Sequence, residues 1–195
     1  MENKNIPYPC KEEVEKYLKA WDSDESFVLQ EKSLDKLFLE LAPKNTDISD
    51  ILIKASTLND FYSTNIFSIF PVAKHIFELN IDERLEEGDT SLVGDIAFVE
   101  IKGKEKHFYS FASKYCSHHK PLLFPIYDSY VENVLVYFSK LDGFAKFKRE
   151  DLKNYQTFKD VIIEFSKFYK IDTYNLKDLD RYLWQLGKEH FPKKY

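Results

Sequence analysis

Cysteine is scarce in this chain, which has only two among 195 residues. Cys10 and Cys116 lie far apart, and neither belongs to a Cys-x-x-Cys pair. The sequence therefore argues against a disulfide framework and against the common zinc and iron-sulfur ligand patterns. We expect no metal, no cofactor and a reducing, cytoplasmic setting for the protein.

Long apolar runs are also missing, since no stretch approaches the roughly 18 consecutive apolar residues of a membrane-spanning helix. Residues 1–10, MENKNIPYPC, lack a cationic start followed by an apolar run. The sequence thus predicts neither a secretory leader nor a membrane partner. It contains no glycine-rich nucleotide loop, no Gly-x-Ser-x-Gly and no His-Glu-x-x-His, so nucleotide, hydride-transfer and zinc-protease functions have no motif in their favour.

Strand periodicity is rare, whereas apolar residues recur at helical spacing along most of the chain. The predicted apolar faces include Val14, Tyr17, Leu18 and Trp21; Leu34, Leu37, Phe38 and Leu41; Ile51, Leu52, Ala55 and Leu58; Val161, Ile162, Phe165 and Phe168; and Leu176, Leu179, Leu183 and Leu186. This pattern predicts an all-α fold. We expect one domain over 1–195, with two possible lobes, about 50–138 and 1–49 with 139–195, around a cleft.

Several helix ends carry recognisable signals. Thr157 with Asp160 is predicted to cap the helix before 168, and Asn175 to cap the last helix. Gly187 is placed as the residue that follows that last helix. The segment 98–108 alternates weakly around Lys-Gly-Lys, and we interpret it as a loop while allowing a short β-hairpin.

Charge is unevenly distributed around a formal net value of -5. Acidic residues crowd 82–89, while basic residues gather at 102–107 and 146–149. The negative total argues mildly against nucleic-acid binding, because cationic side chains supply most non-specific affinity for phosphate. The basic clusters could nevertheless form a strip on the folded chain, or each could be an ordinary solvated face.

Asp128 stands immediately before an amphipathic segment whose apolar face is Val131, Val134, Leu135 and Phe138. The position is that of an N-cap, where a carboxylate accepts a backbone N–H and stabilises the helix by about 1 kcal/mol. A structural cap is one interpretation of Asp128. The other is a catalytic carboxylate.

The catalytic interpretation rests on the pattern Pro-apolar-apolar-Asp-x-x-Val-x-x-Val-Leu over 125–135, with Ser110 lying 18 positions before the Asp. The pattern resembles the core of the helix-hairpin-helix DNA glycosylases, which end in a Gly/Pro-rich loop and an essential Asp. The segment 179–188, closing on Gly187, is similar to the last core helix of those enzymes. The segment 58–69 is similar to their helix on the base-binding side.

The resemblance implies a helical bundle of the glycosylase type, with Asp128 as the catalytic residue. Bifunctional relatives carry a Schiff-base lysine where this chain has Ser110, so the resemblance implies a monofunctional enzyme in which water attacks the sugar. In the hairpin position, 101–107, the family pattern of two glycines is reduced to Gly103. The resemblance then leaves phosphate binding to the lysines of the segment: Lys102, Lys104 and Lys106.

The remaining candidate residues would serve the base and the DNA strand. The candidate base pocket consists of Tyr62, Asn65, Ser110, His118 and Tyr127, and the further DNA contacts are His107 and Lys114. Aromatic rings with amide, hydroxyl and imidazole groups can stack on and hydrogen-bond a flipped base. His118 and His119 are adjacent on a helix and point about 100° apart, which does not suit one shared metal ion.

We therefore expect a monomeric, monofunctional DNA glycosylase that acts on double-stranded DNA with a modified base. It would leave an abasic site, either in base-excision repair or in defence against phage DNA with modified bases. The alternative is a non-catalytic helical module that binds nucleic acid or protein, in which Asp128 is only a cap.

Overall fold

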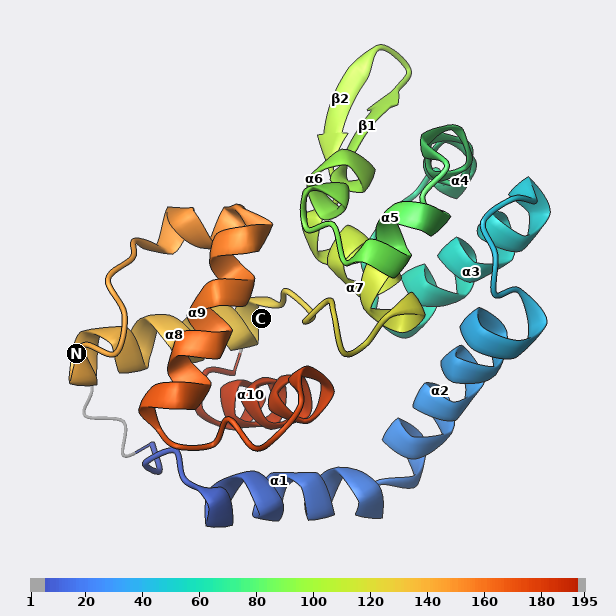
Figure 1. The fold of residues 1–195 in the computed structure, drawn as a ribbon. Coiled ribbons are helices and arrows are strands. Elements are labelled where there is room, and N and C mark those ends of the chain that lie inside the picture. Colours follow the sequence, from blue (N-terminus) through green and yellow to red (C-terminus); the bar gives the residue numbers. More distant parts are fainter. Residues whose placement is uncertain (1–5, 193–195) are drawn as a thin grey trace. The chain divides into compact units, whose positions relative to one another are not determined.

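A computed structural model describes residues 6–192 of the chain. Residues 1–5 and 193–195 lie outside this part. The prediction that residues 1–10 form no secretory leader therefore falls partly outside the described residues. The described residues are predominantly helical, with ten α-helices, one π-helical turn, one 3-10 turn and one two-stranded sheet (Figure 1). The all-α class is therefore confirmed. No helix in residues 6–192 is long and apolar enough to cross a membrane.

The chain divides into two compact units. Met1–Glu25 and Tyr127–Tyr195 form what we call the terminal unit, and Ser26–Ile126 form the central unit. The boundaries lie near 26 and 126, whereas the sequence suggested lobes that change at 50 and 138. Segment 26–49 belongs with the central helices because its side chains pack against them, as Phe38 does against Tyr115 at a ring-centroid distance of 5.4 Å.

The terminal unit contains α1 (Lys11–Ser23), α8 (Ser129–Asp142), the 3-10 turn η2 (Arg149–Lys153), α9 (Tyr155–Phe168) and α10 (Leu176–His190). The first helix packs on the last one, although more than 150 residues separate them in sequence. The Tyr17 hydroxyl donates to Glu189 Oε2 at 2.8 Å, and Gln185 Nε2 donates to the Tyr17 carbonyl at 2.9 Å. The buried face of α10 includes Leu179, Leu183 and Leu186, and burying each such side chain contributes about 1.5–3 kcal/mol.

Gly187 lies within α10, which continues to His190, so its assignment as the residue after the helix is wrong. A Cβ at Gly187 would lie 2.6 Å from the Tyr130 carbonyl oxygen of α8. Glycine is needed here because α8 and α10 approach closely. Glycine often follows the end of a helix, but at position 187 it permits two helices to cross closely.

The central unit contains α2 (Glu25–Asp35), which begins at the boundary, the π-helical turn η1 (Lys36–Leu41), α3 (Ile48–Phe61), α4 (Ile69–Leu79), α5 (Asp82–Glu87), α6 (Ser91–Ala97) and α7 (Tyr109–His119). Helix α3 packs on α4 and α7, and α6 packs on α7. Every residue of α7 except Ser110 is buried, so α7 is the central helix of this unit.

Strands β1 (Phe98–Ile101) and β2 (Lys104–His107) pair as an antiparallel hairpin, in place of the expected loop. Lys102 and Gly103 form the turn with φ of 52° and 72°. Two successive positive φ values are typical of the type I′ turn, whose twist matches that of the strands. The hairpin extends away from the helices of the central unit (Figure 1).

Most residues of the predicted apolar faces are buried or half-buried, and the exposed ones are Leu41 and Phe168, at 66% and 45%. Leu41 is 66% exposed because the preceding turn is π-helical, with a wider repeat that rotates it off the face of Leu34 and Phe38. Asp128 and Asn175 are N-caps, as predicted. The cap of α9 is Asn154, which accepts from Thr157 N, so the predicted pair of Thr157 and Asp160 lies inside the helix.

Candidate functional site

Asp128 caps α8 with its side chain. Its Oδ1 accepts a hydrogen bond from Tyr130 N at 2.9 Å, and its carbonyl oxygen accepts from Glu132 N at 2.9 Å. Its backbone is extended, with φ -140° and ψ 153°, which is the usual conformation of an N-cap. The residue is half-buried. The carboxylate is therefore held in one orientation at the positive end of a helix dipole.

Tyr127, also in the terminal unit, is 5% exposed. Its hydroxyl donates to Glu132 Oε2 and accepts from Lys153 Nζ. Its ring meets Phe158 edge-on at a centroid distance of 5.3 Å. The sequence placed Tyr127 in a base pocket. The structure places its hydroxyl in a buried polar contact beside the first turns of α8.

Four of the predicted residues lie together in the central unit. Ser110, Lys114 and His118 recur every four residues on α7, which puts them on successive turns of one helix face. Lys114 Nζ donates to Ser110 Oγ at 2.6 Å and lies 5.2 Å from the ring centroid of Tyr62. The Tyr62 hydroxyl lies 3.0 Å from His118 Nε2. We call Tyr62, Ser110, Lys114 and His118 the α7 cluster.

The α7 cluster combines an ammonium group, an imidazole, a phenol and a hydroxyl on one strip of side chains. Tyr62 is 37% exposed, whereas His118 is 9% exposed and packs against Phe38 at a centroid distance of 5.4 Å. Such a strip offers an aromatic face for stacking and donors and acceptors for hydrogen bonds. Groups of these kinds can stack on and hydrogen-bond a planar heterocycle.

Asn65 is three positions after Tyr62 in the sequence but does not belong to the α7 cluster. It is exposed in the loop between α3 and α4, with a left-handed φ of 58°. The loop is held by Asn59, whose Oδ1 accepts from Ile66 N at 2.9 Å and from Thr64 Oγ1 at 2.6 Å. Sequence reasoning missed Asn59, although an Asn near a helix end is a known organiser of turns. The same loop exposes Phe67, at 99%.

The hairpin register separates its charges by face. Val99 pairs with Lys106 and Ile101 with Lys104, so both lysines lie on one face. Glu100 pairs with Glu105 on the opposite face, where like charges directly across from each other repel. Lys102 lies in the turn. The predicted phosphate contacts Lys104 and Lys106 therefore form one cationic surface, which we call the lysine face.

His107, the other predicted DNA contact in this segment, lies on the glutamate face with its partner Phe98. The two rings are 4.4 Å apart between centroids, and His107 stacks on Tyr109 at 5.8 Å with an interplanar angle of 8°. His107 thus belongs to a ladder of three rings at the base of the hairpin. It is separated from Lys104 and Lys106 by the pleat of the strands.

A buried polar network, which the sequence did not predict, connects α3 and α7. Lys54 is fully buried, and its Nζ donates to the carbonyl oxygens of Ala42 and Lys44 at 3.0 and 2.9 Å and to Asn45 Oδ1 at 2.7 Å. Tyr115 also donates to Asn45 Oδ1, at 2.7 Å. Burial lowers the pKa of Lys54 to about 8, although the charges of Asp82 and Asp50 oppose this shift. The three protons of the ammonium group match its three oxygen acceptors.

His119 completes this network as a neutral acceptor. Its Nε2 lies 3.3 Å from Asn45 Nδ2 and 3.3 Å from Lys54 Nζ, and Asn45 Nδ2 also donates to Asp82 Oδ1 at 2.7 Å. Burial and the positive charge of Lys54 hold the pKa of His119 well below its ordinary value of 6.5. The network fixes the segment before α3 on α7 and gives the buried His119 its polar partners.

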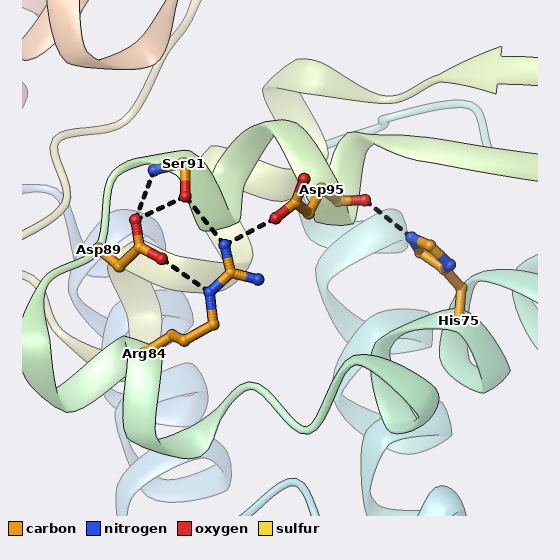
Figure 2. Close-up of polar contacts among 5 residues, drawn as sticks. All are labelled: His75, Arg84, Asp89, Ser91 and Asp95. Atoms are coloured by element: carbon orange, nitrogen blue, oxygen red, sulfur yellow. Dashed lines mark hydrogen bonds and ion pairs between the residues drawn. The ribbon is translucent and has the colours of Figure 1, made fainter.

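Arg84, within the acidic segment 82–89, pairs with Asp89 and with Asp95 at the surface of the central unit. Figure 2 shows its Nε donating to Asp89 Oδ2 at 2.7 Å, and its Nη2 donating to Ser91 Oγ at 2.9 Å and to Asp95 Oδ2 at 2.6 Å. His75 lies 2.8 Å from the Asp95 carbonyl oxygen. Hydrogen bonds from Ser91, and then from Arg84, lower the pKa of the Asp89 carboxyl. These contacts join α4, α5 and α6. Ser91 is hydrogen-bonded to Asp89 and Arg84.

In the described part of the chain, no group of three or more His, Cys, Asp or Glu side chains is arranged to hold a metal ion. Cys116, on α7, is fully buried. Burial raises the pKa of its thiol above the range in which a thiolate forms near neutral pH.

The comparisons with known proteins identify relatives of the chain. The family model described as "HI_0787_N: N-terminal domain" matches residues 13–123, which is more than half of the sequence. A protein of Haemophilus influenzae, described as an uncharacterized protein, is 57% identical over 150 residues, covering 76% of this chain and 72% of that protein. No solved structure matches the chain. The matched family segment ends before Asp128.

Proposed function

We propose that this chain, which belongs to the HI_0787_N family, is a monofunctional DNA glycosylase that hydrolyses the N-glycosidic bond of a flipped, modified base. One observation carries the proposal. Helix α6, the β1–β2 hairpin and α7 follow one another as helix, hairpin and helix, and the next helix, α8, begins at a side-chain cap made by Asp128. The order supports the proposal, because the resemblance also has a hairpin segment, then a helix, then the Asp at the start of the next helix. The form of the hairpin differs, since β1 and β2 are paired strands where the resemblance implies a glycine-containing loop.

The chemistry assigned to Asp128 is electrostatic. Departure of a base leaves positive charge on the deoxyribose ring, and a carboxylate close to that charge stabilises the oxocarbenium-like transition state. The same carboxylate orients the attacking water. The hydrogen bond from Tyr130 N holds the side chain in place before the substrate arrives, so little reorganisation is needed during the reaction.

Water, and not an amine, is the assigned nucleophile. Ser110 occupies the position of the catalytic lysine in bifunctional relatives, and a hydroxyl there cannot form an imine with the sugar. The nearest lysine on α7, Lys114, donates to Ser110 Oγ and lies over the Tyr62 ring. The product is therefore an intact strand with an abasic site.

The α7 cluster and Phe67 are the groups assigned to base flipping. Tyr62 and His118 offer stacking and hydrogen bonding to an extruded base. Extrusion leaves a gap in the base stack, and proteins that distort DNA often fill such gaps with an apolar wedge. Phe67 is 99% exposed in the loop after α3, an exposure that costs free energy unless the ring meets a partner.

The test is an assay for abasic sites on duplex DNA panels, each carrying a different modified base. The proposal predicts that at least one modified base is released, leaving a strand that breaks only after alkali or heat. Release of damaged bases would indicate repair, and release of bases typical of modified phage DNA would indicate defence. Binding to DNA with no release from any panel would favour the alternative, a non-catalytic nucleic-acid-binding module.

A further inference from the structure

Helix α8 begins with an unusual form of staple. In many helices an apolar residue just before the N-cap packs on an apolar residue four positions after the cap, which fixes the angle at which the chain meets the helix. In α8 these two positions are Tyr127 and Glu132, on either side of Asp128. The contact is polar, because the Tyr127 hydroxyl donates to Glu132 Oε2.

Glu132 is a buried carboxylate, with a side chain only 8% exposed. Arg149 Nη1 donates to its Oε1, and Lys153 Nζ lies 3.5 Å from its Oε2, so two cations from η2 face one carboxylate. Burial alone would raise the pKa of Glu132, but the hydrogen bonds from Tyr127 and Arg149 and the charge of Lys153 together lower it. A buried charge is tolerated where it is paired and hydrogen-bonded in this way.

The Tyr127 side chain is held on three sides. Its hydroxyl accepts from Lys153 Nζ while donating to Glu132, the ammonium group lies 4.3 Å from its ring centroid, and its ring edge packs on Phe158. The residue that follows it is Asp128. Fixing residue 127 therefore restricts the backbone of residue 128, from which the capping carboxylate projects.

We propose that Glu132 is a positioning residue: through the Tyr127 hydroxyl it fixes the approach of the chain to α8 and so the orientation of the Asp128 carboxylate. Arg149 and Lys153 keep this polar staple closed by pairing with Glu132. The effect on the cap follows from the geometry alone. The effect on base release rests on the proposed function.

The first measurement is hydrogen exchange at the Tyr130 amide, which donates to Asp128 Oδ1. Tyr127→Phe keeps the ring on Phe158 and removes only the hydroxyl, and Glu132→Gln keeps the size of the side chain and removes its charge. Both variants should exchange the Tyr130 amide roughly five- to tenfold faster than the parent, as expected when a side-chain cap is weakened. Amides in the middle of α8, such as that of Leu135, should be unchanged.

Asn133→Ala is the matched control, since Asn133 accepts from Arg149 Nη1 at 3.0 Å but takes no part in the staple. It should leave Tyr130 exchange at the parental rate. If Tyr127→Phe also leaves it unchanged, the staple does not position Asp128 and the inference is wrong. Tyr127→Phe carries this decision if Glu132→Gln fails to fold.

The second measurement is single-turnover base release with the substrate found for the parent protein. Tyr127→Phe and Glu132→Gln should lower the rate while the affinity for substrate DNA stays at the parental value, because the staple acts on the group that stabilises the transition state. Slower release without faster Tyr130 exchange would overturn the positioning role. If the parent protein releases no base but the variants exchange the Tyr130 amide faster, the staple is supported and only the proposed function is refuted.

Discussion

Gly187 faces the backbone carbonyl of Tyr130 so closely that a Cβ on Gly187 would lie 2.6 Å from the carbonyl oxygen. The contact joins α10 to the first turn of α8, where Tyr130 N donates to Asp128. The crossing of these two helices therefore supports the segment that orients the candidate catalytic carboxylate.

Gly187→Ala should destabilise the protein. The added methyl group cannot avoid backbone atoms, so α8 and α10 must move apart, and overpacking of this kind lowers the free energy of unfolding by about 1–3 kcal/mol. Urea unfolding monitored by circular dichroism measures the change.

Gly94→Ala is the control, because Gly94 lies within α6 and a Cβ there meets nothing within 4 Å. Alanine at an uncrowded helical position should raise the free energy of unfolding by up to about 1 kcal/mol. Equal effects of the two substitutions would show that the α8–α10 contact is not tight.

Local sequence signals were sufficient to predict the features of the fold that depend on neighbouring residues alone. The apolar face behind Asp128 and the caps at Asp128 and Asn175 follow from spacing and residue type alone, and the structure has all of them. Gly187 shows the limit. The same glycine satisfies the signal for a helix end and the need for close packing, and only the position of Tyr130 decides between them.

The parts that could not be predicted depend on distant partners. Lys54 lies on the apolar side of α3 and is fully buried because carbonyl groups at 42 and 44 and the side chain of Asn45 receive its protons. Nothing near Lys54 in the helix pattern indicates those acceptors. Likewise, the spacing of Ser110, Lys114 and His118 predicts that they share a helix face. The contact of Tyr62 with this face is tertiary, and the spacing does not predict it.

His119 should make the stability of the protein sensitive to acid. The folded state keeps this imidazole neutral because its pKa is well below 6.5, whereas the unfolded chain takes up a proton near 6.5. As the pH falls below that value, the unfolded state binds more protons and the free energy of unfolding decreases. The contribution of this one group approaches about 1.4 kcal/mol for each pH unit until the folded pKa is reached.

His119→Gln should flatten this acid dependence, since an amide does not titrate. Urea unfolding of the parent and the variant across the range below pH 6.5 measures the difference. His75→Gln is a suitable control because His75 lies at the surface of the same unit and donates to the Asp95 carbonyl. An acid dependence that His119→Gln leaves unchanged would contradict the buried, neutral state of this histidine.

The lysine face of the hairpin should dominate its contribution to DNA binding. Replacing both Lys104 and Lys106 with Ala should weaken binding to all sequences and reduce the slope of log affinity against log salt by up to about 2 units. Glu105→Gln should not weaken binding, because Glu105 points to the opposite face. Fluorescence anisotropy over a salt series gives these slopes, and an unchanged slope in the double variant would remove the hairpin from the interface.

Borohydride should trap no covalent adduct between the protein and substrate DNA. Ser110 cannot form an imine, and Lys114 is engaged by Ser110 Oγ. A trapped adduct in the parent protein that disappears in Lys114→Met would assign the nucleophile to Lys114 and make the enzyme bifunctional. Denaturing gel electrophoresis after reduction distinguishes the two outcomes.

The central claim is that Asp128 acts as a carboxylate and not only as a cap, and Asp128→Asn separates these roles. Asparagine keeps an oxygen that can accept from Tyr130 N, so the helix cap and the free energy of unfolding should change little. Single-turnover base release should nevertheless fall by on the order of a hundred- to a thousandfold, since a group that stabilises transition-state charge has been neutralised. Release by the folded Asp128→Asn protein at the parental rate would show that Asp128 is only a cap and would contradict the proposed mechanism.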